Sequence, residues 1–313
     1  MDKKPYLSIC IPANGRIEYL RNTLNSIYNE KNLFECDQDD FEVIVSDNNS
    51  SKSLEVLSKE FRYSNFKYFY TECEGFMNSY FALTYGNGCF IKLHNSQEIF
   101  NPGALSMLIG NIKRNVDKKP LMFFTSGLLQ KGTIREYDNF NEFNYNLSYL
   151  SSWSNGISIW KEDFDLIAHS VSLNMLFPHT SIFFTQHYKN QFVINDQHLF
   201  TTQFIKKRGG HNKFHAFTIE YPSLIEKAHN KGCIKLETKN KIFNDILYNY
   251  LPLLFFNVKI AKRETFSSEG FQNDIKVYFS KWSYWQVLIF SFCIPIKIIW
   301  RKIKIKYLLK SKF

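Results

Sequence analysis

The N-terminal part of the chain alternates short apolar runs with segments of helical apolar spacing, and this alternation constrains the fold most. Residues 6–11 (YLSICI) form an apolar run that ends at Pro12, and residues 17–29 then place apolar side chains on one helical face. Alternating strands and helices favour an α/β fold with a mainly parallel sheet flanked by helices. The same pattern predicts further strands at 41–45, 67–70 and 89–93, and helices near 54–61 and 76–85.

Polar loops follow three of these strands, after Ile11, Val45 and Leu93. In a parallel α/β sheet, the carboxyl ends of the strands meet at one edge, where ligands bind. We therefore expect the three loops to line one crevice.

The pattern loosens beyond residue 120, where we expect a strand at 121–129, an aromatic-rich polar loop at 135–149 and a strand at 154–160. Residues further on have helical spacing in places. We divide the chain into three parts, residues 1–105, residues 106–225 and a helical C-terminal region at 226–313.

The composition of the chain restricts the chemical class of its binding partners. The chain has 313 residues with 39 Lys and Arg against 29 Asp and Glu, a formal net charge of +10. This excess favours an anionic partner, and because no recognised nucleic-acid-binding motif occurs, we expect no nucleic acid. The six cysteines lack metal-ligand spacing and are expected to be reduced. The apolar stretch before Pro12 is too short for a signal peptide, so we expect a cytoplasmic protein.

The C-terminal end has the composition of a membrane-surface segment. Residues 282–300 are apolar with aromatic ends but are interrupted by Pro295 and Lys297, and residues 301–313 are basic. Such a segment is too interrupted to span a bilayer, while Trp at the interface and Lys or Arg near anionic lipid favour peripheral binding. The alternative is a basic amphipathic helix that packs on its own domain.

Three motifs, LSICIPANGR, VSDNNSS and NSQEIFNPGAL, resemble those of the inverting glycosyltransferases of family 2 with the GT-A fold, in particular the abequosyltransferase-like enzymes of surface polysaccharide assembly. The resemblance covers about residues 6–110. It implies a GT-A fold, with residues 1–105 as the nucleotide-sugar-binding half and 106–225 as the acceptor-binding half, and a nucleotide-sugar donor whose base or ribose contacts Asp47. The composition of the C-terminal end adds a helical, membrane-associating region to this fold. The residues that the resemblance implies for donor binding are Pro12, Ala13, Arg16, Asp47, Asn48, Asn78, Asn95, Ser96 and Gln97.

The third motif departs from the family pattern. Asn95, Ser96 and Gln97 stand where the family has the D-x-D carboxylates that hold a divalent cation, and Glu98 is the remaining carboxylate. A one-residue shift would use Ser96 and Glu98 instead. A hard divalent ion prefers charged oxygen ligands, so we expect no metal cofactor. A weak Mn²⁺ or Mg²⁺ site through Glu98 is the alternative.

A departing diphosphate still needs positive charge. We predict that Lys207 and Arg208 provide it, with Lys92 and His94 as further candidates. Strand alternation would turn Lys92 away from the crevice. The segment KKRGGHNK, which contains Lys207 and Arg208, is otherwise a solvated turn.

An inverting transfer needs a base for the acceptor hydroxyl. We predict His179, which follows Phe177 and Pro178 in a region where related enzymes carry an acidic base. Asp163 is the second catalytic candidate, together with Asp165. The competing interpretation of His179 is an ordinary loop histidine.

The sequence thus predicts an inverting, metal-independent glycosyltransferase on the inner face of the membrane. Its partners would be a nucleotide-sugar donor, a glycan or lipid-linked acceptor, and the anionic membrane surface. Because the carboxylate pair is lost, the alternative is a catalytically silent relative that scaffolds a glycan-assembly complex.

Overall fold

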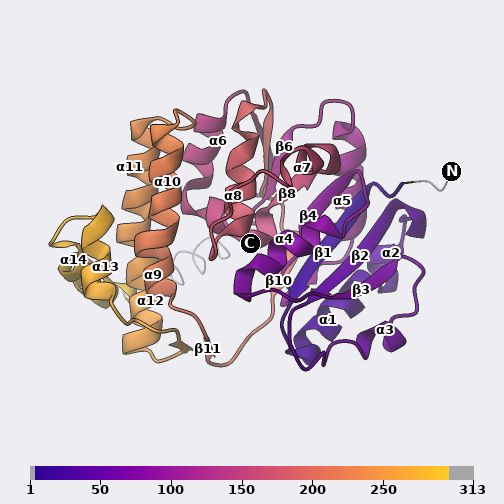
Figure 1. Cartoon of the computed structure of the whole chain (residues 1–313), viewed down its shortest axis with the longest axis horizontal. Coiled ribbons are helices and arrows are strands. Elements are labelled where there is room, and N and C mark those ends of the chain that lie inside the picture. The colour runs from indigo at the N-terminus through magenta and orange to yellow at the C-terminus, as the bar shows by residue number, and fades with distance from the viewer. Residues whose placement is uncertain (1–3, 296–313) are drawn as a thin grey trace, which may run out of the picture. The chain divides into compact units, whose positions relative to one another are not determined.

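The computed structural model describes residues 4–295, in which the chain forms two compact units (Figure 1). The first unit comprises the residues up to Phe204 together with Lys231–Lys235. The second comprises Ile205–Asn230 and the residues from Leu236 onward. The division into nucleotide, acceptor and C-terminal parts concerns function and stays a prediction.

A five-stranded, mostly parallel sheet forms the centre of the first unit as described, in the order β3-β2-β1-β4-β8. The first four strands run parallel, as the alternation predicts, whereas β8 runs antiparallel to β4. The strands are β1 (Leu7–Ala13), β2 (Phe41–Asp47), β3 (Phe66–Tyr70), β4 (Phe90–Leu93) and β8 (Ser158–Trp160).

Helices cover both faces of this sheet. Leu7, Ile9 and Ile11 alternate along β1 and pack in one buried core with α1 and α5, and the opposite face, which carries Ser8 and Cys10, is covered by α4. All three core side chains are fully buried. The helices along this half are α1 (Ile17–Ile27), α2 (Glu30–Leu33), α3 (Leu57–Glu60), α4 (Asn78–Thr84) and α5 (Ala104–Asn115), with short 3₁₀ turns η1 (Gln38–Asp40) and η2 (Gly75–Met77).

The rest of the first unit adds two small sheets, in the orders β6-β9-β7 and β10-β5. They consist of β5 (Glu98–Phe100), β6 (Leu121–Phe124), β7 (Ile134–Tyr137), β9 (Phe192–Asn195) and β10 (Phe200–Thr202). The accompanying helices are α6 (Phe140–Leu147), α7 (Lys161–Ile167) and α8 (Pro178–Thr185), with 3₁₀ turns η3 (Ser148–Ser152), η4 (Ser154–Gly156) and η5 (Gln186–Tyr188).

Two sequence-based expectations are wrong here. Residues 135–149 are not a loop, because they contain most of β7 and all of α6, whose first turn is capped by the Asn139 side chain accepting from the Glu142 N–H at 2.9 Å. The strand predicted at 121–129 ends at Phe124, because the buried carboxylate of Asp196 accepts backbone N–H groups from Leu129, Lys131 and Gly132 and folds that segment into a loop.

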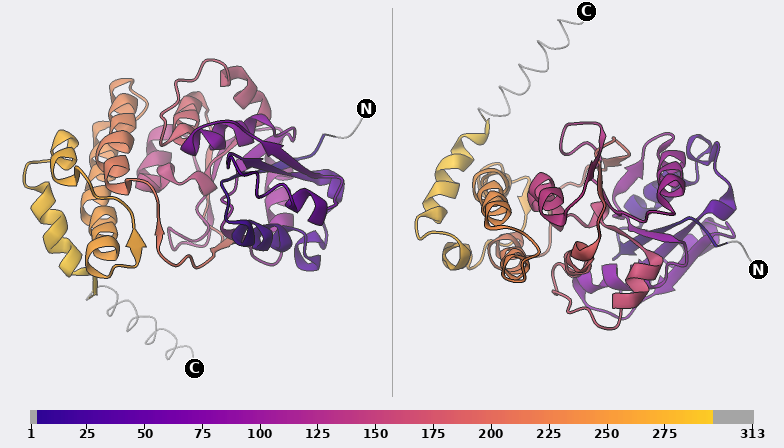
Figure 2. Two further views of the ribbon diagram at one scale, coloured as in Figure 1. Left: turned by 60° about the horizontal axis from the view of Figure 1, so that its bottom comes forward. Right: turned by 90° about the horizontal axis from the view of Figure 1, so that it is seen from above.

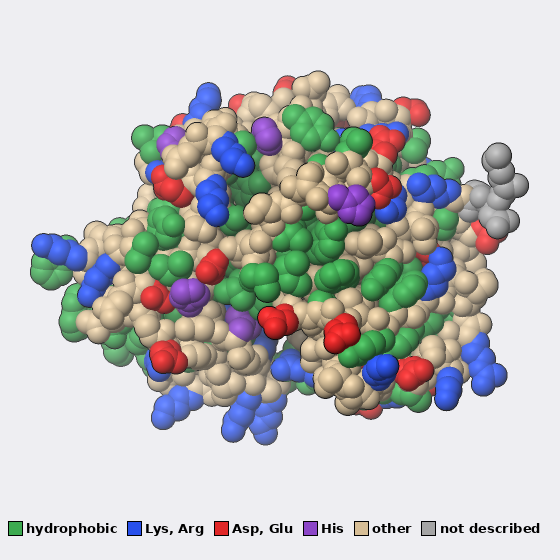
Figure 3. All heavy atoms as spheres, in the orientation of Figure 1, with side chains coloured by type: hydrophobic (Ala, Val, Ile, Leu, Met, Phe, Trp, Pro, Cys, Tyr) green, Lys and Arg blue, Asp and Glu red, His purple; other side chains and the backbone are tan. Residues whose placement is uncertain are grey.

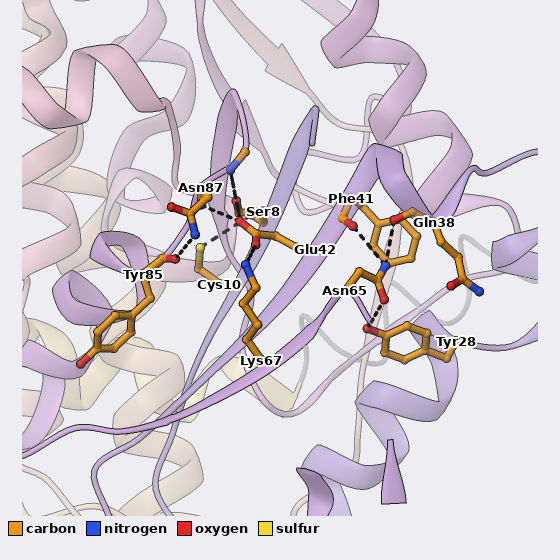
Figure 4. Close-up of polar contacts among 11 residues, drawn as sticks. Ser8, Cys10, Tyr28, Gln38, Phe41, Glu42, Asn65, Lys67, Tyr85 and Asn87 are labelled. Carbon is orange, nitrogen blue, oxygen red and sulfur yellow. Dashed lines mark hydrogen bonds and ion pairs between the residues drawn. The ribbon is translucent and has the colours of Figure 1, made fainter. Parts of the chain in front are cut away.

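A closed polar network lies at the amino ends of the strands (Figure 4). The Glu42 carboxylate accepts hydrogen bonds from Ser8 Oγ at 2.7 Å, from Lys67 Nζ at 2.8 Å and from the Asn87 N–H at 2.6 Å, and Gly88 N–H donates to both Ser8 Oγ and Glu42. Burial alone would raise the pKa of Glu42, but the hydrogen bonds from Lys67 and Ser8 outweigh it and hold that pKa below its ordinary value. The network joins β1, β2, β3 and the turn before β4.

The second unit is helical in its described part, as expected for the C-terminal region, and Figure 2 shows its helices in orange to yellow. Its core includes Phe214, Phe271 and Ile275. No helix within residues 4–295 is long and apolar enough to cross a membrane. The elements are α9 (Lys213–His215), α10 (Tyr221–Asn230), α11 (Leu236–Asp245), α12 (Leu251–Phe255), α13 (Phe271–Tyr278), α14 (Ser283–Phe292), the π turns η6 (Ala216–Glu220), η7 (Ile246–Tyr250) and η8 (Phe256–Ile260), and the paired β11 (Arg208–Gly209) and β12 (Glu264–Thr265).

Candidate active site

The carboxyl ends of β1, β2 and β4 lie side by side, because β1 pairs in parallel with both neighbours. Ala13 at the end of β1 is opposite Asp47 at the end of β2, and His94 N–H donates to the Cys10 carbonyl at 2.8 Å. The three motif loops therefore share one edge of the sheet. This is the edge at which parallel α/β sheets bind ligands.

A cluster of asparagines braces this edge. Asn78 Nδ2 donates to the carbonyls of Ala13 at 3.0 Å and Ser46 at 2.8 Å, and so ties β1 to β2. Asn48 Oδ1 accepts from Asn14 Nδ2 at 2.9 Å. Asn78 is buried and its amide group donates to these carbonyls, so its observed contacts brace the two strands, and its predicted part in donor binding stays a prediction.

Asp47 is fully buried at the end of β2. Its carboxylate accepts from the Asn49 N–H and from Tyr68 Oη, both at 2.9 Å. The first contact closes an Asx-type turn that presents the following polar residues. Asp47 thus holds the loop after β2 as well as standing at the position that the donor motif assigns to it.

The loop after β1 contains two consecutive residues in the left-handed region, Gly15 at φ 61° and Arg16 at φ 58°. Glycine adopts this conformation freely, but arginine pays a steric cost for it. The conformation places Arg16 at the start of α1 with its side chain exposed. A strained basic residue at the ligand-binding edge is typical of a functional loop.

The loop after β4 has hydroxyl donors on the oxygens that the sequence offers to a divalent cation, and the expected absence of a metal stays a prediction. Asn95 Oδ1 accepts from Ser154 Oγ at 2.7 Å, and both carboxylate oxygens of buried Glu98 accept from Thr202 Oγ1 at 2.9 and 3.0 Å. Asn95 and Glu98 thus each accept a hydrogen bond from a hydroxyl group of another segment. Within residues 4–295, no group of three or more His, Cys, Asp or Glu side chains is placed to hold a metal ion.

Lys92 is a fully buried lysine directly beneath this loop. Its Nζ donates to the carbonyls of Leu93 at 2.8 Å and Asn155 at 2.6 Å, and it lies 4.6 Å from the centre of the Phe200 ring. Burial lowers the pKa of Lys92 to about 7. Burial, together with the charge of Lys92, also holds the pKa of His94 well below its ordinary value, so His94 is neutral.

His179 lies on the first turn of α8 and is buried. Its Nε2 is 2.9 Å from the Ser152 carbonyl, and its Nδ1 has no hydrogen-bond partner within the described residues. A carbonyl only accepts, so this contact assigns the proton to Nε2 and leaves a lone pair on Nδ1. Burial lowers the pKa of His179 to about 4, which keeps the ring neutral at pH 7.

The segment 152–155 connects His179 with the loop after β4. Ser152 accepts from His179, whereas Ser154 donates to Asn95 and the Asn155 side chain accepts from the Asn95 N–H at 2.8 Å. The structure therefore brings His179 and Asn95 to one short segment. Sequence reasoning missed Asn155, for which the only signal was the turn composition of Ser154, Asn155 and Gly156.

Asp163 lies elsewhere. It follows Trp160, which pairs with Phe90 at the start of β4, so Asp163 belongs to the amino edge of the sheet. Its carboxylate also forms an ion pair with Lys189 at 2.6 Å. These contacts place Asp163 away from the carboxyl edge, so its catalytic part stays a prediction, and the substitute Asp165 is exposed and paired with Lys161.

Lys207 and Arg208 belong to the second unit. Arg208 pairs with Glu264 in the β11–β12 ladder, and the Lys207 carbonyl accepts from Thr265 Oγ1 at 3.3 Å. Their predicted role toward a diphosphate stays a prediction.

Comparisons with known proteins agree with the fold. Residues 8–159, slightly less than half of the chain, match Glycosyl transferase family 2. TarS 1-349 of S. aureus has 15% identity and a TM-score of 0.55 over 91% of this chain and 88% of its own. The mannosyltransferase PcManGT of Pyrobaculum calidifontis has 13% identity and a TM-score of 0.53 over 96% and 88%.

These solved structures include TarS 1-349 in complex with UDP-GlcNAc, at 14% identity, and PcManGT in complex with GDP-Man and Mn2+. No curated protein matches the chain. The family match and the shared architecture support a GT-A-like fold and a glycosyltransferase.

Proposed function

We propose that this protein transfers a sugar, with inversion and without a divalent metal, from a nucleotide-sugar donor to a glycan or lipid-linked acceptor in surface polysaccharide assembly. The observation that carries the proposal is the shared edge of β1, β2 and β4, where the three motif loops lie together and the loop after β4 contacts a segment that also contacts His179. The abequosyltransferase-like motifs support the polysaccharide role. Donor binding in the solved neighbours supports a nucleotide-sugar ligand.

In this proposal the base is His179. Its Nδ1 accepts the proton of the acceptor hydroxyl as the oxygen attacks the anomeric carbon and the bond from that carbon to the diphosphate breaks. The Ser152 carbonyl fixes the tautomer and the ring orientation that this step needs. The residues around Asp47 and Arg16 hold the donor.

Metal independence rests on the loop after β4. Its neutral side chains and the bonds from Ser154 and Thr202 leave no anionic pair for a cation. Positive side chains then steady the diphosphate, for which Arg16 is exposed at this edge and Lys207 and Arg208 are the predicted partners.

Release of nucleoside diphosphate from UDP-, GDP-, CDP- and dTDP-sugars tests the activity, in buffer that contains EDTA. We expect turnover of at least one donor and loss of that turnover in His179→Ala. Variants Lys207→Gln and Arg208→Gln test the diphosphate role separately. Turnover that requires added Mn²⁺ or Mg²⁺ would contradict the metal-independent part.

The second candidate is a catalytically silent relative that scaffolds a glycan-assembly complex. The occupied oxygens of Asn95 and Glu98 favour it. It predicts donor binding, or none, without any release of diphosphate under either metal condition.

We also propose a cytoplasmic protein that binds the inner face of the membrane peripherally. The basic sequence of residues 301–313, which lie outside the described residues, supports this location. Such a position would bring lipid-linked acceptors to the enzyme.

A further inference from the structure

Helix α14 buries two small polar side chains and exposes several large apolar ones. Its buried positions include Ser283 and Ser291, which are 1% and 0% exposed. A helix that packs on a protein core normally buries its large apolar residues and exposes small polar ones. Four large apolar side chains of this segment instead face outward: Trp282 at 63%, Trp285 at 53%, Ile289 at 64% and Phe292 at 67% exposure.

These four residues form one continuous surface, which we call the α14 stripe. They are spaced three, four and three residues apart, so they lie on the same face of the helix. The rest of α14 is fixed to the second unit through contacts with α12 and α13 and through buried Val287. The stripe is therefore held outward by a packed helix and does not depend on a loose end of the chain.

Basic groups adjoin the stripe. The Lys281 ammonium lies 5.8 Å from the centre of the Trp282 ring, and Lys276 on α13 is exposed. Figure 3 shows basic and apolar side chains next to one another on the part of the surface that α13 and α14 form. The sequence that follows α14 is also basic, from Lys297 to Lys312.

The chemistry of this surface selects a lipid bilayer among apolar partners. Tryptophan prefers the interfacial region of a membrane, and lysine next to it attracts anionic headgroups. The ten residues of α14 extend about 15 Å, about half of a bilayer core, so the helix can lie in the interface but cannot span it.

We propose that α14 binds the surface of an anionic membrane by inserting Trp282, Trp285, Ile289 and Phe292 among the lipids. This inference rests on the peripheral membrane association proposed above and assigns it to a surface within the folded unit. The basic residues after α14 then add electrostatic attraction, and the stripe provides the apolar anchor.

The test compares vesicle binding of three full-length proteins and one truncated chain. The stripe variant carries Trp282→Gln, Trp285→Gln, Ile289→Gln and Phe292→Gln, which keep helix-compatible residues at exposed positions. The matched control carries Leu166→Gln and Phe204→Gln, which are 78% and 87% exposed in the first unit. The truncated chain ends at Pro295 and keeps the stripe.

Sedimentation with mixed phosphatidylglycerol and phosphatidylcholine vesicles measures the partition coefficient. We expect the stripe variant to lose about 100-fold in partition coefficient, since each apolar side chain withdrawn from lipid weakens binding by up to about tenfold. The control should bind like the wild type. The truncated chain should bind more weakly but should still show a blue shift of tryptophan fluorescence and quenching by brominated lipid.

Equal partition of the stripe variant and the wild type would overturn the proposal, as would vesicle binding that disappears entirely in the truncated chain. A stripe that pairs two copies of the chain would also overturn it. That outcome would appear as a concentration-dependent dimer without vesicles, lost in the stripe variant. Turnover of a soluble acceptor analogue, measured on the same proteins, separates a failure of membrane binding from a failure of the proposed glycosyl transfer.

Discussion

The two edges of the central sheet each contain a buried charged side chain, but the two charges are satisfied differently. At the amino edge, Glu42 is paired with Lys67 and receives donors from Ser8, Asn87 and Gly88. At the carboxyl edge, the Lys92 ammonium donates only to two carbonyls and lies against aromatic rings.

The surroundings differ in the same way. Within the described residues, His94 Nδ1, Asn155 Nδ2 and His179 Nδ1 are buried without a hydrogen-bond partner, and all three residues belong to the carboxyl edge or contact the segments there. At the amino edge, Asp163 Oδ2 also lacks a hydrogen bond, but it forms an ion pair with Lys189 at 2.6 Å. Unsatisfied buried polar atoms are costly and rare in structural regions. The difference indicates that the amino edge is built for stability, whereas the carboxyl edge keeps hydrogen-bonding capacity for a ligand or solvent.

The largest effect should come from His179→Ala. Removal of a general base typically costs about 10² to 10⁴ in rate, and we expect donor affinity to change little because His179 serves the acceptor. The rate of nucleoside diphosphate release and the calorimetric affinity for the donor, measured on the same variant, check this prediction.

The wild-type kcat/KM should stay level from pH 7 down to about pH 5, because the pKa of His179 is about 4 and the ring stays neutral in this range. An acid limb near pH 6.5 would contradict the assignment.

Glu42→Ala should destabilise the protein by disrupting the polar network at the amino edge of the sheet. Loss of the carboxylate leaves the Ser8 hydroxyl and the Asn87 N–H without their acceptor, whereas the Gly88 N–H keeps Ser8 Oγ, so we expect about 2–4 kcal/mol less free energy of unfolding. Lys67 is partly exposed and can be hydrated, which limits the loss. Urea denaturation measures the change. A structural edge predicts unchanged donor affinity in the refolded variant, and a weakened affinity would contradict the comparison.

Asp47→Ala should lower both the stability of the fold and the affinity for the donor. The motif assigns Asp47 to the donor, and its buried carboxylate also accepts hydrogen bonds from Tyr68 and Asn49. We expect about 1–3 kcal/mol lower stability together with at least about tenfold weaker donor binding. Asp47→Asn should lose less of both because one acceptor oxygen remains. Donor affinity equal to that of the wild type, in a folded variant, would remove Asp47 from the donor site.

The effect of Lys92→Met should be visible mainly in the pH dependence of stability. The folded-state pKa of about 7 lies below the unfolded value of 10.5, so the unfolded chain binds more protons between these values. Stability therefore rises with pH in this window, by up to about 1.4 kcal/mol per pH unit. The wild-type minus Lys92→Met difference in unfolding free energy isolates this slope. If the unfolding free energies of the wild type and of Lys92→Met change in parallel from pH 7 to 10, Lys92 is not a buried lysine with a lowered pKa.

The sequence was sufficient for the parallel part of the sheet. The runs ending at Ile11, Val45 and Leu93 are bounded by proline or polar residues, and periodicity of two and of 3.6 separates strands from helices there. It failed at residues 135–149, where Asn, Glu and Tyr between Phe140, Phe143 and Leu147 obscure an apolar helical face. Local composition cannot show that a distant strand will cover such a face.

The site was predictable in its parts but not in its contacts. The motifs place Asp47 and Asn95 on neighbouring loops, which the strand order bears out. That Asp163 belongs to the opposite edge follows from the antiparallel pairing of β8, a tertiary property without a local signal. The same holds for Asn78 and Lys92, whose polar groups are used up by carbonyls of segments distant in sequence.

Calorimetric titration of UDP-, GDP-, CDP- and dTDP-sugars in EDTA tests the central claim most directly, namely that the carboxyl edge binds a nucleotide-sugar without a divalent ion. We expect at least one donor to bind, and added Mn²⁺ to change its Kd by less than about twofold. The variant Asn95→Asp with Gln97→Asp should instead gain metal-dependent affinity, since it restores a carboxylate pair. A wild-type protein that binds no donor in EDTA and binds one once Mn²⁺ or Mg²⁺ is added would contradict the account.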